Sequence, residues 1–167
     1  MAGYLRQAEL YGDMRRIMLS SVFFARDIIV ANTYITDGLG VARSALQSCS
    51  AEFGKIMSDH FPMTVAHDIT ESFRALYTAV SGNSAAKTNT PERLSTTLAV
   101  AMSMADYGGM RDKMNQIACN FAEYAKHTTQ KSHETALEIF QNIMNDSQTL
   151  ADMIARAMAD KFPDRYK

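Results

Sequence analysis

Apolar residues recur at alternating spacings of three and four along most of the chain, which is the pattern of amphipathic helices packed on one another. The pattern is longest over residues 132–161, which contain no glycine or proline. The apolar stripe there consists of Ile139, Ile143, Leu150, Met153 and Ala157, widened by Phe140 and Ile154. Asp146 stands between Ile143 and Leu150, where the spacing predicts an apolar side chain. We therefore expect a long helix with one carboxylate in its apolar stripe.

The same spacing predicts five further helices, separated by breaks that are rich in glycine, proline or small polar residues. They cover residues 4–33, 41–57, 62–80, 92–107 and 110–127. Residues 81–91 have loop composition, and Gly108 and Gly109 are expected to end the helix over 92–107. In the first helix Ser21 interrupts the apolar seam, where a bond from its hydroxyl to a carbonyl one turn earlier would satisfy it.

These elements predict an all-α fold, an up-and-down bundle of about six helices in a single domain over residues 1–167. A weak internal repeat accompanies them. Met14 and Met18 in the first helix match Met110 and Met114 in the fifth, with an arginine directly after the first methionine of each pair. Two copies of a helix–connection–helix unit would give the bundle an internal pseudo-symmetry.

Composition narrows the classes of partner. The net charge of −1 and the pI of about 6.4 give no basic face for a nucleic acid, and no apolar run approaches the length of a membrane span. The start of the chain lacks the apolar core of a secretory signal, so we expect a cytoplasmic or otherwise intracellular protein. Cys49 and Cys119 are expected to be small core residues, and the twelve methionines to fill the core.

The basic residues of the first helix and the turn after it carry no recognisable chemistry. We expect Arg15, Arg16, Arg26 and Arg43 to form a solvated face.

Residues that could carry chemistry are few. The four histidines, His60, His67, His127 and His133, form none of the spaced pairs that metal sites in helical bundles use, so we expect no metal and no cofactor. Neither cysteine has a candidate base within one helical turn, and no phosphate-binding or nucleophile motif is present. The sequence therefore predicts no catalytic site.

Asp146 is the residue at which a functional role is most plausible from the sequence. A carboxylate in an apolar stripe costs several kcal/mol unless it is bonded or protonated. Its partner could be Ser21, His67 or a backbone donor, or the helix could rotate so that the carboxylate reaches water. His67 and Asp68 are adjacent and point about 100° apart on a helix, so they are not expected to form a catalytic pair with each other.

Three features together resemble a family of small helical-bundle proteins. They are the segment from Leu150 to Ile154, the closing residues 161–164, and the six-helix layout with a methionine-rich fifth helix. The family occurs in bacteria, in large DNA viruses and in environmental sequences. It has no established activity and is labelled inconsistently as kinase or glycosyltransferase. The resemblance spans about residues 10–164.

The resemblance implies a set of buried histidines on four helices, often preceded by glutamate. In this chain Ser20-Ser21, His67-Asp68, Ile117 and Asn145-Asp146 stand at the corresponding places. Ser21 and Asp146 would then mark a site that has lost its ligands. A member that keeps the bundle without the ligands implies a structural or interaction protein.

We therefore expect a non-enzymatic structural or protein–protein interaction protein, acting through protein partners or self-association, for example as a component of a virus particle. An alternative is a small-ligand or metal-binding bundle of hemerythrin-like architecture, with Ser21, His67, Asp68 and Asp146 around a core cavity. A third class, a catalytic bundle, would use Asp146 and requires a cleft beside it.

Overall fold

The computed structural model describes residues 2–82, 89–104 and 107–166, and every regular element in these ranges is a helix. The helices are α1 (Ala2–Tyr34), α2 (Leu39–His60), α3 (Met63–Ser81), α4 (Thr90–Met102), α5 (Gly108–Thr129), α6 (His133–Lys161) and the single turn α7 (Pro163–Tyr166). The predicted all-α bundle is confirmed, with α7 as an addition to the six expected helices.

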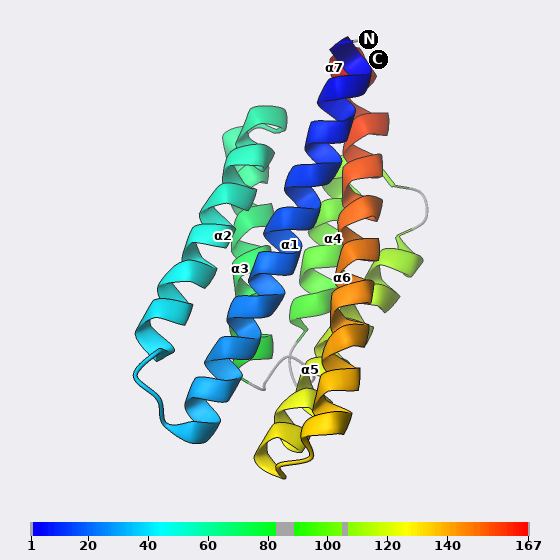
Figure 1. Ribbon diagram of the computed structural model, residues 1–167. Helices are drawn as coiled ribbons and strands as arrows, with labels where there is room; N and C mark the ends of the chain where they lie inside the picture. Colours follow the sequence, from blue (N-terminus) through cyan, green and yellow to red (C-terminus); the bar gives the residue numbers. More distant parts are fainter. Residues whose placement is uncertain (1, 83–88, 105–106, 167) are drawn as a thin grey trace.

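The six long helices run up and down the bundle, so that each contacts its neighbours in the sequence (Figure 1). Contacts between α1 and α6 close the arrangement, and α1 also contacts α3 and α5. Both chain ends lie at one end of the bundle, together with α7 (Figure 1). The opposite end carries the α1–α2 and α5–α6 turns (Figure 1).

Buried apolar side chains from all six long helices form one continuous cluster. Phe53 of α2 and Phe73 of α3 stack at its centre with their ring centroids 4.1 Å apart. The four methionines of the proposed repeat, Met14, Met18, Met110 and Met114, are fully buried. Met14 lies well inside α1 whereas Met110 lies in the first turn of α5. The repeat therefore stays a prediction.

Two predicted boundaries are wrong. The helix expected over 92–107 ends at Met102, where Ser103 takes a left-handed conformation (φ 56°) and its amide donates to the carbonyls of Ala99 and Val100. Gly108 and Gly109 do not end that helix but begin α5. The predicted loop over 81–91 shares Ser81 with α3 and Pro91 with α4, and its residues 83–88 lie outside the described residues. Proline fits the first turn of α4 because the missing N–H is not needed there.

The segment Leu5–Tyr34 of α1 is long and apolar enough to cross a membrane by length and composition alone, since its most apolar 18-residue window has a mean hydropathy of 1.2. This differs from the expectation that no segment approaches a span. A core helix passes the same test, and α1 contributes Met14, Ile17 and Val22 to the buried cluster. The segment is therefore weak evidence for a membrane.

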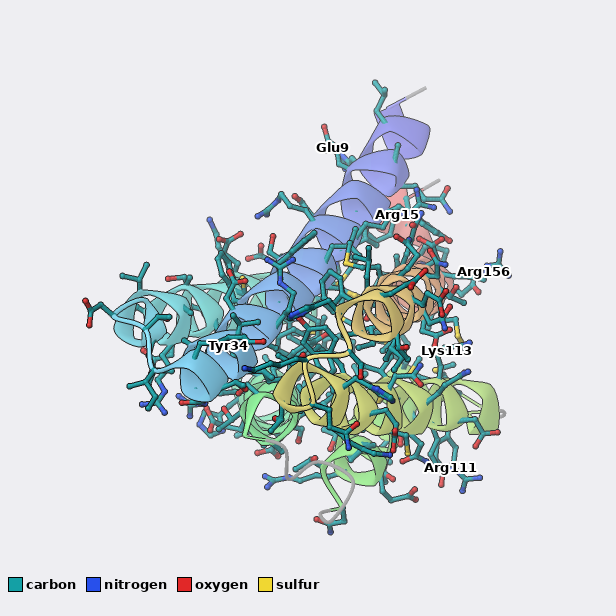
Figure 2. All side chains as sticks on the ribbon, turned by 60° about the horizontal axis from the view of Figure 1, so that its bottom comes forward. Glu9, Arg15, Tyr34, Arg111, Lys113 and Arg156 are labelled. Atoms are coloured by element: carbon teal, nitrogen blue, oxygen red, sulfur yellow. The ribbon has the colours of Figure 1, made fainter. Side chains whose placement is uncertain are left out.

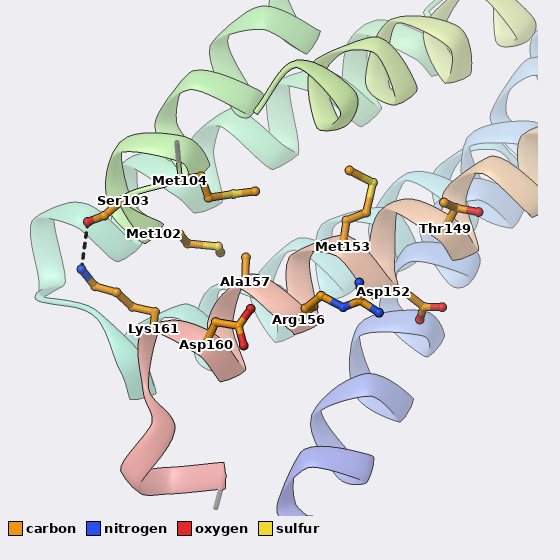
Figure 3. Close-up of a pocket in the computed structure, with 10 residues that line it drawn as sticks. All are labelled: Met102, Ser103, Met104, Thr149, Asp152, Met153, Arg156, Ala157, Asp160 and Lys161. Carbon is orange, nitrogen blue, oxygen red and sulfur yellow. Dashed lines mark hydrogen bonds between the residues drawn. The ribbon is translucent and has the colours of Figure 1, made fainter. Parts of the chain in front are cut away.

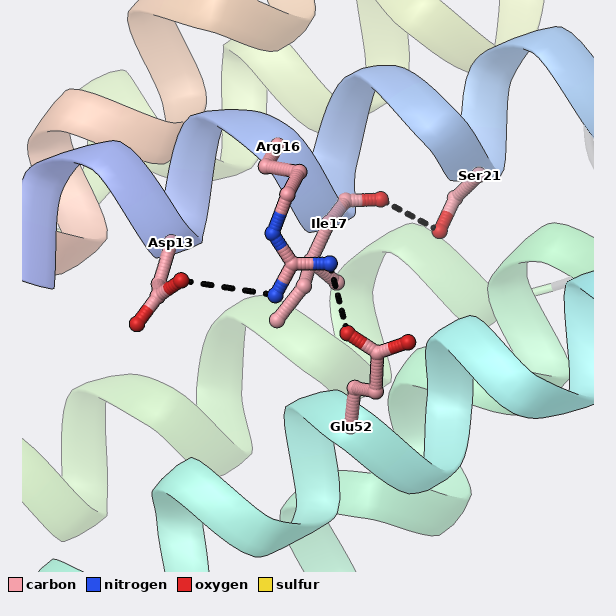
Figure 4. Close-up of polar contacts among 5 residues, drawn as sticks. All are labelled: Asp13, Arg16, Ile17, Ser21 and Glu52. Atoms are coloured by element: carbon pink, nitrogen blue, oxygen red, sulfur yellow. Dashed lines mark hydrogen bonds and ion pairs between the residues drawn. The ribbon is translucent and has the colours of Figure 1, made fainter.

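Arg15 and Arg16 lie on the exposed side of α1, as the sequence predicted, and each also forms an ion pair with a neighbouring helix. Arg15 donates to both carboxylate oxygens of Asp152 on α6, at 2.6 and 2.8 Å. Arg16 donates to Glu52 on α2 at 2.6 Å (Figure 4). These pairs lie at the surface and link α1 to α6 and to α2.

Candidate functional site

Ser21 lies in the interior of α1 and is fully buried. Its hydroxyl donates to the carbonyl oxygen of Ile17 at 2.8 Å (Figure 4). This is the bond to the preceding helical turn that the sequence predicted. The bond satisfies the donor of Ser21 without a ligand.

Asp146 lies at the edge of the buried face of α6, and its side chain is 14% exposed. One carboxylate oxygen accepts a hydrogen bond from Lys113 Nζ of α5 at 2.9 Å, and Asn120 Nδ2 approaches the other at 3.5 Å. The predicted partners Ser21, His67 and a backbone donor are therefore wrong. Asp146 belongs to an ion pair between α5 and α6.

The predicted register of the α6 stripe is also wrong at this point. The fully buried positions of the stripe are Ile143, Ser147, Leu150 and Ile154, so Ser147 stands where Asp146 was expected. Both registers alternate three and four, and residues 143 and 150 belong to both. The apolar pattern alone could not separate them, because the choice depends on the helices that lie beside α6.

His67 and Asp68 lie on the exposed side of α3. His67 Nδ1 and Asp68 Oδ1 are 3.6 Å apart, closer than their expected directions suggested but longer than a hydrogen bond. Asp68 borders a surface hollow of about 600 Å³ between α3, α4 and the end of α6. Neither residue lies near the core position of Ser21, so the four candidates do not surround one cavity.

No group of three or more histidine, cysteine, aspartate or glutamate side chains in the described ranges is arranged to hold a metal ion. His60 ends α2, where its Nδ1 lies 2.8 Å from the carbonyl oxygen of Ile56 and its Nε2 contacts the Tyr166 hydroxyl of α7. Phe162 packs on His60 as well, with ring centroids 5.3 Å apart. This histidine therefore fastens the C-terminal turn to the bundle.

The interior holds polar side chains that sequence reasoning did not single out. Tyr77 of α3 is buried, with its hydroxyl 3.8 Å from the sulfur of Met18. Burial raises the pKa of Tyr77, the nearby Cys49 thiol raises it further, and the Ser147 hydroxyl acts in the opposite direction. The Ser147 oxygen itself is buried without a hydrogen bond of acceptable geometry. No sequence signal marks this contact, because it joins three different helices.

The two cysteines differ in their surroundings. Cys49 is buried, and burial raises the pKa of its thiol, as expected of a core residue. Cys119 is exposed, so its prediction as a core residue is wrong. It lies two positions after the buried Ile117 on α5, which turns it away from the core.

Arg26 of α1 lies beside a pair of contacting aromatic rings, Phe23 of α1 and Phe140 of α6, whose centroids are 5.5 Å apart. The three residues lie toward the end of the bundle that carries the α1–α2 and α5–α6 turns. The guanidinium carbon of Arg26 is 5.2 Å from the ring centroid of Phe23 and 5.0 Å from that of Phe140. Tyr34, labelled in Figure 2, and Leu137 flank a hollow of about 260 Å³ beside Arg26 and Phe140. We call Phe23, Arg26, Tyr34, Leu137 and Phe140 the aromatic patch.

Three members of the aromatic patch are accessible to a partner. Phe23 is 39% exposed, Tyr34 42% and Leu137 69%. The patch is held in place by neighbouring contacts: Arg26 also donates to its neighbour Asp27 at 2.7 Å, and the Tyr34 hydroxyl donates to the Thr128 carbonyl oxygen at 3.2 Å. A partner would therefore meet side chains that are already ordered.

No protein-family model matches the chain, and searches of curated proteins and of solved structures give no significant match. The resemblance to small helical-bundle proteins therefore stays a prediction.

Proposed function

We propose that the protein is a non-enzymatic interaction protein that binds a protein partner through the aromatic patch. The observation that carries the proposal is the arginine packed against two contacting phenylalanines beside exposed Tyr34 and Leu137. Aromatic residues and arginine are enriched in protein interfaces and dominate their binding energy. Apolar side chains on a monomeric surface are ordinarily scattered singly.

The order within the patch favours binding. Arg26 is fixed by two rings and by Asp27, so it loses little rotamer freedom when a partner covers it. The hollow beside it can receive a partner side chain. The sequence candidates support the same proposal, since Ser21 and Asp146 are engaged within the bundle and His67 and Asp68 face solvent.

A second copy of the chain is the simplest partner. Arg26 and Asp27 present opposite charges beside the same apolar side chains. Two copies related by a twofold axis could bring Arg26 of each near Asp27 of the other while Phe23 and Leu137 are covered. A twofold interface needs only one self-complementary surface.

The proposal is tested by light scattering coupled to gel filtration, over a wide range of protein concentration, with native mass spectrometry of the same samples. We expect a dimer or a higher oligomer. Phe23→Ser and Leu137→Ser should each weaken it by about tenfold or more, because each removes a large apolar contact. Met63→Ser is the matched control, since Met63 is 85% exposed on α3, outside the patch.

Circular dichroism checks that the variants keep their helical content. A wild-type chain that stays monomeric at the highest concentration would overturn self-association. Equal weakening by Met63→Ser and Leu137→Ser would show that the oligomer does not use the aromatic patch.

A further inference from the structure

A second surface lies between the C-terminal end of α4 and the last third of α6 (Figure 3). It is a hollow of about 750 Å³, within the size range of small-molecule sites. Its apolar lining consists of Met102, Met104, Met153 and Ala157. Methionine side chains adapt to differently shaped apolar ligands, because they are unbranched and polarizable.

Some of the charged side chains at the rim of the hollow have ion-pair partners and others have none. Asp152 is held by Arg15 through two hydrogen bonds, which neutralises its carboxylate. Lys161 donates to the Ser103 hydroxyl at 3.0 Å, a contact that leaves its charge uncompensated (Figure 3). Within the described residues, the side chains of Arg156 and Asp160 make no hydrogen bond and no ion pair. The rim therefore carries two cations without an ion pair, which lie toward opposite ends of the hollow, and the free carboxylate of Asp160 between them (Figure 3).

We infer that this hollow binds a small amphiphilic anion, with its apolar body on the methionines and its carboxylate, sulfate or phosphate head at Arg156. Arg156 is suited to the head because a free guanidinium can donate two parallel hydrogen bonds to such a group. The inference does not depend on the aromatic patch, since the two surfaces share no residue.

The hollow is less suited to a cation or to an uncharged chain. A cationic head would have only Asp160 to pair with, because Asp152 is already bound by Arg15. An uncharged chain would gain the methionine contacts without using Arg156. The sign of the head group is therefore the sharpest test.

The experiment measures binding of decanoate to the whole protein by isothermal titration calorimetry, below the concentration at which the ligand forms micelles. Decyltrimethylammonium and decanol serve as cationic and uncharged ligands with the same chain. We expect decanoate to bind about tenfold or more tightly than either, the size of a charge-assisted hydrogen bond to the head group. Octanoate should bind more weakly than decanoate, because it buries two fewer methylene groups.

Variants locate the site. Arg156→Gln should weaken decanoate binding by about tenfold. Arg93→Gln is the matched control, an exposed arginine on α4 that lies about 14 Å along the helix from Met102. Met153→Gln should weaken binding of every ligand in the set, whereas Met153→Leu should keep it.

Several outcomes would overturn the inference. One is the absence of decanoate binding to the wild-type protein. A second is decyltrimethylammonium binding as tightly as decanoate. A third is decanoate binding that Arg156→Gln leaves unchanged, or that Arg93→Gln weakens equally. Thermal melting of each variant separates loss of the site from loss of the fold, and Met153→Leu provides a folded test of the apolar lining.

Discussion

Gly54 of α2 lies against Thr70 of α3. A Cβ atom placed there would lie 2.9 Å from both Cγ2 and Oγ1 of Thr70. Thr70 is fixed in turn by a 2.7 Å hydrogen bond from its hydroxyl to the Ala66 carbonyl oxygen. Both branches of Thr70 are therefore too near for a larger residue. Gly12 on α1 has open space around the same position.

Substitution of these two glycines should have opposite effects. Gly12→Ala should stabilise the protein by up to about 1 kcal/mol, because alanine favours the helix and nothing opposes the new methyl group. Gly54→Ala should lose that gain and destabilise the protein by about 1 kcal/mol, the cost of moving Thr70. Urea denaturation of both variants measures the difference. Equal stabilisation by the two would show that α2 and α3 lie farther apart in solution.

Ser147 is a second residue for which the sign of the change in stability on replacement can be predicted. Its hydroxyl is buried near Tyr77 but forms no hydrogen bond. Burying an unsatisfied polar group costs about 1–3 kcal/mol, so Ser147→Ala should be neutral or stabilising by about 1 kcal/mol in chemical denaturation. A loss of stability would mean that Ser147 and Tyr77 form a hydrogen bond in solution. Ser21→Ala is the comparison, since the Ser21 hydroxyl is already bonded.

Among the helices, α6 shows what the apolar pattern could predict and what it could not. The pattern predicted the long last helix over residues 132–161, close to the observed α6 (His133–Lys161). It misplaced Asp146 and overlooked Ser147, because a helix covered on several sides has a buried face wide enough for either register. The predicted turn at Gly108 failed for a related reason: a left-handed Ser103 ended α4 earlier, and residue type alone gave no sign of it.

The ion pair between Asp146 and Lys113 should matter more than its counterparts at the surface. The two side chains are 14% and 26% exposed, so each is partly removed from water. Asp146→Ala should cost about 1–2 kcal/mol, between the values for exposed and buried pairs, because it leaves Lys113 without its carboxylate. The measurement is the free energy of unfolding in urea.

A double-mutant cycle identifies the source of that cost. Lys113→Met/Asp146→Ala should recover part of the stability lost in Asp146→Ala, because the unpaired ammonium is removed. No recovery would contradict an interaction between the two side chains. Recovery would support a stabilising ion pair between α5 and α6 as the role of Asp146.

At the scale of the whole molecule, most helix contacts join neighbours in the sequence, and α1 with α6 provides the long-range closure. This arrangement explains why the fold class could be predicted from the apolar pattern: amphipathic helices joined by short connections bury their stripes on one another in a bundle. The candidate site could not be predicted in the same way. The aromatic patch and the methionine-lined hollow each combine side chains from distant segments, and neither leaves a local motif.

The two proposed surfaces should act independently. Leu137 of the aromatic patch and Arg156 of the methionine-lined hollow are both on α6, roughly 30 Å apart at the rise of an α-helix. Ile143, Leu150 and Ile154 between them are fully buried, and a packed core does not transmit small displacements continuously. Leu137→Ser should leave decanoate affinity unchanged, and saturating decanoate should leave the oligomeric state unchanged. If decanoate instead shifts the oligomeric equilibrium, oligomerisation must change decanoate affinity by the same factor, and α6 would then have to exist in two arrangements.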